Sequence, residues 1–408
     1  MNYLQKKKLA FMSIVNSVKG FIRTITGVFP LTLTNCVDEE SITDYTIYGN
    51  SVQNGTPTPD TPIEVESVGV KTNNLVTAED GYVVKYDENN YISYAAATQE
   101  FTIHGSGFKS YFHFPETLPS GTVTSLYAEI VNSDYEFING SLSVGGYGDN
   151  KDWQNVVHFT ATSPKKQGSV YTITDATDKL CILVSGDSEV KNVRIRITYA
   201  VQSEPFKAYE PYNRYKIPIT VSGNGKSVVT NIYLDEPLRK VGDYADYIDF
   251  ENSNVVRNIA YERITTVTTK SSDRLVFLSP ISQKPFVNSS GDRSVGYAMS
   301  DKFVRNTDTY GSLLSKAQFR DTAYIQTYIT SSKANRVAYT FGDVSVTTVA
   351  LAQEAIGDGF DVIYAVETPT ETPITLPNIP TFRGTTVLSV GTTQPSNTEI
   401  TYYSTLKG

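Results

Sequence analysis

The stretch "NVRIRITYAV", residues 192–201, decides the fold class, because apolar and polar side chains alternate along it with a period of two. This period places successive side chains on opposite faces of a β-strand. The residues that would share the apolar face are Val193, Ile195, Ile197 and Tyr199. The stretch therefore predicts a strand with one face in a hydrophobic core.

Similar short segments recur from about Leu75 to Tyr199, separated by glycine, asparagine and aspartate. They include "YISYAAATQEFTIHGSG", "SLYAEIV", "SLSVGGYGDN", "VVHFTAT" and "SVYTITD". The chain also has 28 tyrosines among 408 residues, a composition that favours strands over helices. Because many short strands with turn residues between them are typical of sandwiches, residues 72–215 are predicted to form a jelly-roll β-sandwich like that of carbohydrate-binding modules.

Residues 216–408 are predicted to form a second β-rich domain. Within it, "SGNGKS" has the composition of a hairpin turn between two strands. "SVTTVALAQEAIGDG" predicts one short helix that ends at Gly357, because glycine commonly follows the last helical residue. The whole chain is therefore expected to be mainly β.

The first 29 residues predict the one long helix. Apolar residues recur there at heptad spacing until Gly27 and Pro30 end the pattern. These residues are Leu4, Phe11, Ile14, Val18, Phe21, Ile25 and Val28. The helix either lies on its own domain or forms a stem that oligomerises the chain or docks into a partner protein. β-Branched residues at the heptad core positions favour three or more helices, so a homotrimer is the expected oligomer.

Residues 30–71 contain "YGNSVQNGTPTPDTPIEVESVG", Tyr48–Gly69. Pro57, Pro59 and Pro62 exclude a helix there, because proline lacks an N–H group and restrains the residue before it to extended conformations. We expect residues 30–71 to be an extended, Pro- and Thr-rich β linker. The segment "TPTETPITLPNIPTF", residues 368–382, is similar, so two extended arms would bracket the β body.

Composition excludes several classes of function. The formal net charge is −8 although the first 37 residues carry only basic charges, and an acidic body argues against a nucleic-acid ligand. The apolar runs are shorter than the roughly 18 residues of a membrane span. Lys19 and Arg23 interrupt the signal-peptide-like start, so secretion is not expected. Cys181, in "KLCILVSG", predicts a buried free thiol more than a disulfide or a nucleophile.

The sequence also predicts no enzyme, no metal site and no cofactor. In "GNGKS" the first glycine of a phosphate-binding loop is replaced by Thr220. The three histidines lack metal-ligand spacing, and no nucleophile-elbow motif occurs. Asp243, Asp246 and Asp249 alternate with aromatic residues, which predicts a loop that fixes its own backbone. Two carboxylates that face each other only in space, as in a depolymerase, would leave no such motif.

The loop "GGYGDNKDWQN" is the candidate ligand site. It holds the only tryptophan, and its candidate binding residues are Trp153, Tyr147, Asp149, Asn150 and Gln154. A shallow glycan site needs an aromatic ring against the C–H face of a sugar and polar groups for the hydroxyls, and sandwiches commonly place ligands on loops. The alternative is that Trp153 caps the sandwich core.

Several segments carry a resemblance to a known group of proteins. "YTIYGNSVQNGTPTPDTPIEVESVGVKTNNLV" resembles the opening of structural proteins of phages and prophages of Gram-positive bacteria, in which a G-N-S-x-Q-x-G-T-P-T-P-x-x-P segment precedes a jelly-roll-like module. "VRIRITYAVQSEPFKAYEPY", "YLDEPLRKVGDYADYIDFENSNVVRNI" and "TPTETPITLPNIPTFRGTTVLSV" are similar to that group too. The group more often has an acidic Q-L-E-x-G run before its Y-x-P-Y. Its members are tail, fibre, baseplate and receptor-binding proteins.

The resemblance implies a protein of the phage virion, on the surface of the head or the tail. We expect a fibre or receptor-binding component that presents the sandwich to a cell-surface polysaccharide of the host and has other virion proteins as partners. The helix would anchor and oligomerise the chain, and residues 30–71 would connect it to the sandwich. The alternatives are a non-catalytic connector or decoration protein without a glycan site, a polysaccharide depolymerase and a secreted adhesin.

Overall fold

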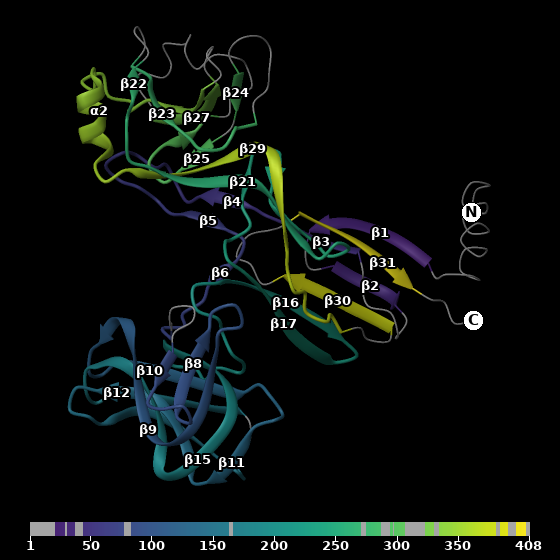
Figure 1. Ribbon diagram of the computed structural model, residues 1–408. Helices are drawn as coiled ribbons and strands as arrows, with labels where there is room; N and C mark the ends of the chain where they lie inside the picture. Colours follow the sequence, from purple (N-terminus) through teal and green to yellow (C-terminus); the bar gives the residue numbers. More distant parts are fainter. Residues whose placement is uncertain are drawn as a thin grey trace. The chain divides into compact units, whose positions relative to one another are not determined.

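A computed structural model describes residues 21–28, 31–36, 44–76, 83–162, 166–270, 275–286, 294–296, 298–306, 323–329, 334–380, 384–390 and 397–404 (Figure 1). The chain divides into two compact units. Unit 1 is Met1–Val70 together with Lys216–Gly408, and unit 2 is the single stretch Lys71–Tyr215. Unit 2 is thus inserted into the sequence of unit 1, and it begins one residue before the predicted sandwich.

The described part of unit 2 is an antiparallel β structure. Its strands are β7 (Val83–Lys85), β8 (Tyr91–Ala95), β9 (Glu100–Leu118), β10 (Val123–Ile130), β11 (Glu136–Asn139), β12 (Ser141–Gly148), β13 (Trp153–Thr160), β14 (Lys166–Thr172) and β15 (Thr177–Val201). The strand order is β13-β12-β15-β9-β8-β7, and β10 pairs with both β14 and β15.

Two long strands, β9 and β15, connect the two layers of unit 2. The first part of β15 pairs with β12, from Thr177 to Val184, whereas its last part pairs with β10, up to Val201. β9 follows β15 along both parts, with breaks in register between them. Side chains from both parts meet in one core, which includes Phe101, Phe112, Leu142, Phe159, Ile182 and Tyr199. Unit 2 is therefore a β structure with one core, whose two parts share the long strands β9 and β15.

The alternation in residues 192–201 is confirmed in β15. Val193, Ile195 and Tyr199 are fully buried, and Ile197 is 2% exposed. Each belongs to the core of unit 2. The arginines between them lie on the other face, where the Arg196 Nη2 atom donates to Glu100 Oε1 at 2.8 Å.

The two ends of unit 2 are joined by hydrogen bonds. The N–H of Thr72 donates to the carbonyl of Arg214 at 2.7 Å. Asn74 is 3% exposed and makes four hydrogen bonds: its Nδ2 donates to the carbonyls of Ile197 and Glu210, and its Oδ1 accepts from the N–H groups of Val76 and Tyr199. These hydrogen bonds hold the first and the last residues of unit 2 together within the unit.

Unit 1 is also built from strands. They are β1 (Phe21–Val28), β2 (Leu31–Cys36), β3 (Asp44–Tyr48), β4 (Ser51–Gln53), β5 (Val65–Ser67), β6 (Val70–Lys71), β16 (Tyr215–Gly223), β17 (Lys226–Leu234), β18 (Lys240–Val241), β19 (Tyr244–Ala245), β20 (Tyr247–Asp249), β21 (Asn254–Ile264), β22 (Thr269–Lys270), β23 (Phe277–Pro280), β24 (Ser294–Gly296), β25 (Ala298–Ser300), β26 (Val304–Arg305), β27 (Tyr324–Ile329), β28 (Asn335–Tyr339), β29 (Phe360–Pro373), β30 (Gly384–Val390) and β31 (Asn397–Ser404).

The longest sheet of unit 1 has the order β1-β31-β3-β20-β21-β29-β25, so strands from both ends of the sequence lie in it. β21 and β29 are its longest paired strands and lie side by side in Figure 1. One core of unit 1 gathers around Ile47, Ile217, Ile248 and Leu388. A second core gathers around Phe277, Phe303, Tyr339 and Phe360.

The short helix and the hairpin of the C-terminal region are confirmed. Helix α2 spans Val349–Ile356, and the Oγ1 of Thr348 caps its start by accepting from the Leu351 N–H. Gly357 follows the helix with a φ of 56°, a conformation that glycine adopts without a steric cost. β16 and β17 are joined through Asn224 and Gly225, both with positive φ, as the "NG" turn predicts.

The helical stem is wrong for residues 21–28. These residues form β1, which pairs antiparallel with β31 from Phe21↔Ser404 to Val28↔Asn397. A heptad pattern and a strand rich in β-branched residues overlap in short segments, and pairing with a distant strand decided between them. Leu4, Phe11, Ile14 and Val18, the remaining heptad residues, lie outside the described residues.

In the segment predicted as an extended β linker, residues 30–71, strands β2 to β5 belong to unit 1. β3 pairs with β31 and β20, and β4 pairs with β5. Pro57, Pro59 and Pro62 lie in the non-helical loop between β4 and β5. The similar segment at residues 368–382 differs in structure, since its first part belongs to β29.

The described residues thus confirm a mainly β chain with one short helix. Among them, no helix has the length and the apolar character that crossing a bilayer requires.

Replacing Asn74 with alanine should lower the free energy of unfolding of unit 2 by about 3 kcal/mol, because four buried backbone groups lose their partner. Chemical denaturation followed by circular dichroism measures the change. Asn73→Ala is the matched control, since Asn73 is exposed. Equal midpoints for the two variants would contradict this role of Asn74.

Cys181 should resist alkylation in the folded protein. Its side chain is fully buried and free, and burial raises the pKa of its thiol to about 12, so the reactive thiolate is scarce at pH 8. Mass spectrometry of the Cys181 peptide after iodoacetamide treatment should show modification only in denaturant. Rapid modification in native buffer would disprove the burial.

Candidate functional site

The loop that carries the sequence-predicted site is the turn between β12 and β13. Tyr147 and Trp153 are register partners on these two strands. Their rings are perpendicular, with centroids 5.5 Å apart. Asp149 and Asn150 are exposed at the turn, and the Asn150 N–H donates to Asp175 Oδ2 at 2.8 Å. The structure therefore brings four of the five predicted residues together at one edge of a sheet.

Gln154, the fifth residue, is 1% exposed and supports the backbone beneath the site. Its Oε1 accepts from the N–H and the hydroxyl of Thr174, and from the N–H of Asp175. A surface ligand cannot reach this side chain. The prediction of Gln154 as a binding residue is corrected to a supporting role, because sequence alone does not show that a bulge turns it inward.

A third ring extends the pair of aromatic residues across the sheet. The ring centroid of Tyr111, on β9, lies 5.3 Å from that of Tyr147. Tyr111 and Trp153 are half-buried, whereas Tyr147 is 8% exposed between them. We call Tyr111, Tyr147 and Trp153 the aromatic row. Trp153 and Tyr147 stand on neighbouring strands, whereas β15 lies between Tyr147 on β12 and Tyr111 on β9. The two tyrosine rings therefore lean toward each other across β15, and the row crosses the sheet from β13 to β9.

The aromatic row lies on the outer face of its layer because its residues alternate with core residues. Phe112 on β9, Val144 on β12 and Val157 on β13 belong to the core of unit 2. Tyr111 and Tyr147 occupy the intervening positions, which place side chains on the opposite face of each strand. Cys181 on β15 is the register partner of Tyr111 on β9 and of Gly145 on β12. A small side chain and a glycine therefore lie on the sheet between the rings of Tyr111 and Tyr147.

Charged groups surround the aromatic row. Lys179 pairs with Tyr147 in register, and its ammonium lies 2.8 Å from Asp178 and 3.8 Å from Asp149. This ion pair lowers the pKa of Asp178, chiefly through the hydrogen bond from Lys179. The His113 Nδ1 is 3.3 Å from the same carboxylate. Next to the other end of the row, the Lys109 ammonium lies 5.5 Å from the Tyr111 ring centroid.

Part of the other outer face of unit 2, formed by β10 and the last part of β15, is covered. The segment from Phe206 to Tyr212 lies against it: the Phe206 N–H donates to Ser125 Oγ, and the Glu210 N–H donates to Thr198 Oγ1 at 2.8 Å. Tyr209 donates from its hydroxyl to Gln99 at 2.5 Å. The residues of the face that carries the aromatic row are exposed in several places instead, including Lys109, His113, Asp149 and His158.

The arrangement can bind a ligand that has an apolar face and hydroxyl groups. Aromatic rings offer apolar contact area, while tyrosine hydroxyls, carboxylates and the lysines offer hydrogen bonds. Burial raises the pKa of Tyr147, so its phenol stays protonated at neutral pH and can donate a hydrogen bond. Rings mounted on strands are held more rigidly than rings on a loop, which lowers the entropy lost on binding.

Two residues of this face, Tyr111 and Lys109, escaped the reasoning from sequence. The stretch "FKSYFHF", residues 108–114, holds a signal for them, since its phenylalanines alternate with lysine, tyrosine and histidine. That alternation places Lys109, Tyr111 and His113 on the outer face. Their proximity to Trp153 depends on the pairing of β9, β15, β12 and β13, and the alternation alone does not reveal this pairing.

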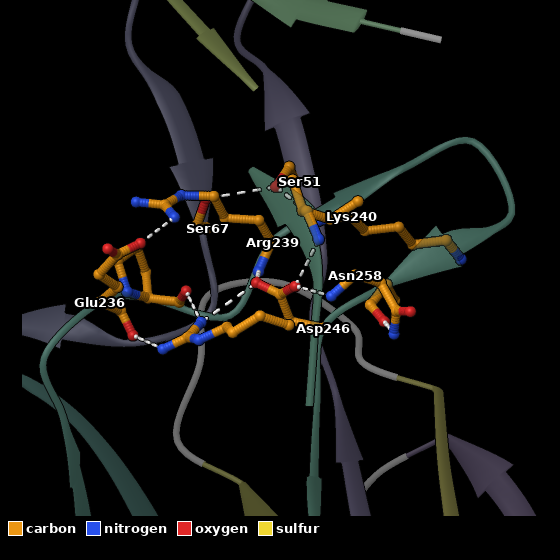
Figure 2. A network of polar contacts seen from close by, with 11 residues as sticks. Ser51, Ser67, Glu236, Arg239, Lys240, Asp246 and Asn258 are labelled. Atoms are coloured by element: carbon orange, nitrogen blue, oxygen red, sulfur yellow. Dashed lines mark hydrogen bonds and ion pairs between the residues drawn. The ribbon is translucent and has the colours of Figure 1, made fainter. Parts of the chain in front are cut away.

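A second cluster of charged groups surrounds Asp246 in unit 1 (Figure 2). The side chain of Asp246 is fully buried. Its Oδ1 accepts from the N–H groups of Asn258 and Ile259 at 2.8 and 2.9 Å. Its Oδ2 accepts from the Arg239 N–H and from Arg257 Nη1, both at 3.1 Å. Burial raises the pKa of the carboxyl, while Arg257 and the backbone donors act in the opposite direction.

The cluster joins distant segments of unit 1. Arg257 also donates to the carbonyls of Pro237 and Glu236, and Lys240 donates its backbone N–H to Ser51 Oγ at 2.9 Å. Figure 2 shows Asp246 between these groups, with Glu236 next to Arg239. Every oxygen of the Asp246 carboxylate is thus occupied by protein donors. The cluster fits a structural role, and Asp249, which accepts from the Asn252 N–H, fixes its own turn in a similar way.

Within the described residues, no group of three or more histidine, cysteine, aspartate or glutamate side chains is arranged to hold a metal ion.

Comparison of the chain with protein-family models, with curated proteins and with solved structures gave no match.

Replacing Asp246 with alanine should destabilise unit 1 by about 3 kcal/mol, because it leaves the partly buried Arg257 charge and three backbone N–H groups without their acceptor. Thermal unfolding followed by calorimetry measures the loss. The neighbouring Asp243 is exposed, so Asp243→Ala should leave the transition almost unchanged. A similar small effect of both substitutions would show that the cluster is dispensable.

Proposed function

We propose that the protein is a structural component of a phage virion, a fibre or receptor-binding protein whose unit 2 binds a glycan on the host surface. The observation that carries the binding part is the aromatic row, three rings in sequence on an outer sheet face with exposed polar neighbours. The resemblance of several segments to phage structural proteins of Gram-positive bacteria supports the virion part. The inserted position of unit 2 supports its role as a presented module.

The binding mechanism would rely on stacking and on hydrogen bonds, without chemistry on the ligand. A sugar ring would lie against Trp153 and Tyr111, the two half-buried rings of the aromatic row. Asp149, Asn150 and Lys179 would exchange hydrogen bonds with its hydroxyl groups. A face this shallow binds weakly by itself, and repetition of the site in a homo-oligomer would raise the avidity.

The proposed oligomer is a homotrimer held together through the N-terminal residues. The heptad residues Leu4 to Val18 support it, since they precede the part of the pattern that forms β1. Other virion proteins are the proposed neighbours of unit 1.

The second candidate is a connector or decoration protein of the virion without a glycan site. It is favoured by the burial of Tyr147 and Gln154, because both side chains are used within unit 2. In that case the aromatic row would pack on the sheet and stabilise unit 2. This corresponds to the alternative in which Trp153 caps the core instead of binding a ligand.

Trp153→Ala and Tyr111→Ala should each weaken binding to bacterial surface polysaccharides about tenfold or more, since a stacked ring contributes about 1–3 kcal/mol. Binding of the purified full chain to an array of these polysaccharides measures the effect. Tyr261→Ala is the control, because Tyr261 is 47% exposed on β21 of unit 1. If the wild-type chain binds no polysaccharide, the connector function gains and the glycan function fails.

A further inference from the structure

Lys109 stands out among the charged groups next to the aromatic row. Its side chain is exposed on β9, and its ammonium lies 5.5 and 5.6 Å from the ring centroids of Tyr111 and Tyr147. A hydrogen bond with Tyr111 raises the pKa of Lys109. The lysine is therefore fully charged at neutral pH and is held over the two rings.

Several cations of unit 2 are neutralised by nearby carboxylates. Lys179 pairs with Asp178, Lys191 with Glu136, and Arg196 with Glu100. Lys109 makes no ion pair with a carboxylate of the described residues. Its partners are aromatic rings, which attract a cation but leave its hydrogen-bonding capacity toward solvent largely unused.

The charges on the face are unevenly placed along the strands. On β9 and β15, His113 pairs in register with Lys179, next to Asp178 and Asp149. Lys109 pairs with Leu183, two outward-facing positions further along the sheet, and His158 lies on β13 in hydrogen-bond contact with Ser143. The carboxylates thus lie along one side of the aromatic row, and a lysine without a carboxylate partner lies on the other side.

We propose that this face selects an acidic glycan, in which a sugar with one carboxylate or phosphate places its anion at Lys109 and its ring on the aromatic row. The inference rests on the proposed glycan-binding function and adds the chemical class of the ligand. An anion at Lys109 would complete an ion pair next to two rings that already orient the ammonium. The carboxylates near Lys179 would repel the anion from the other side of the row, and so they fix the direction of the ligand.

The net charge of the chain limits the ligand further. Because the formal net charge of the whole chain is −8, the protein would repel a densely charged polyanion at long range. A glycan that carries its acidic groups at intervals, between neutral sugars, matches a face with a single lysine of this kind.

The test uses the full chain and an array of bacterial surface polysaccharides. Each acidic polysaccharide is measured before and after its charge is removed: uronic acids by carboxyl reduction, and phosphate groups by dephosphorylation. We expect the strongest binders to be acidic and to lose about fivefold in affinity when neutralised, as for one exposed ion pair. Which treatment weakens binding identifies the anion as a carboxylate or a phosphate.

Variants separate this inference from the proposed function. Lys109→Gln should lower affinity for acidic polysaccharides about fivefold and leave neutral ones unchanged, whereas Lys109→Arg should retain binding. Lys207→Gln is the control, an exposed lysine in the segment that covers the opposite face. Strongest binding to neutral polysaccharides, or equal loss of acidic ligands by Lys207→Gln, would overturn the selection at Lys109. If no polysaccharide binds, the glycan function itself fails and the inference falls with it.

Discussion

The pairing of β9 with β15 is the constraint on which unit 2 depends. Both strands are long enough to run through both parts of unit 2, so their register fixes which residues of each part face the core. The same register sets the outer face, because each inward phenylalanine of residues 108–114 places its neighbour outward. The aromatic row therefore follows from the core. A shift of one residue between these strands would bury Tyr111 and expose Phe112.

The insertion of unit 2 into the sequence of unit 1 is the second constraint on the fold. Unit 1 is formed from both ends of the sequence, with β1 and β31 as neighbours, so its sheets close only after the whole chain is available. Unit 2 is inserted into the sequence of unit 1, and the hydrogen bonds of Thr72 and Asn74 join the two ends of unit 2. In unit 1, the buried Asp246 takes up backbone donors from β21 and from the residue before β18. Both units thus use a few buried polar groups to join segments that are far apart in sequence.

Sequence reasoning predicted the local features well. Alternation in residues 192–201, the turn at Asn224 and the end of α2 at Gly357 each depend on neighbours along the chain, and the structure agrees with them. It failed where pairing between strands that are distant in sequence decides the structure. Residues 21–28 satisfy a heptad pattern and also suit a strand, and only the pairing with β31, from Phe21↔Ser404 to Val28↔Asn397, resolves the choice. For the candidate site, Trp153 and Tyr147 could be found from one loop, whereas Tyr111 could not, because three strand pairings bring it there.

The central claim is that the aromatic row is a glycan-binding surface, and the chain offers a direct way to test it. Trp153 is the only tryptophan, so the tryptophan fluorescence of the full chain reports on one end of the aromatic row alone. The measurement is a titration with a bacterial surface polysaccharide that the chain binds, followed at once by fluorescence and by calorimetry. If the ligand lies on the aromatic row, the emission of Trp153 changes saturably, with the same midpoint as the calorimetric binding curve. Binding by calorimetry without any change in the emission would place the ligand elsewhere and contradict the account.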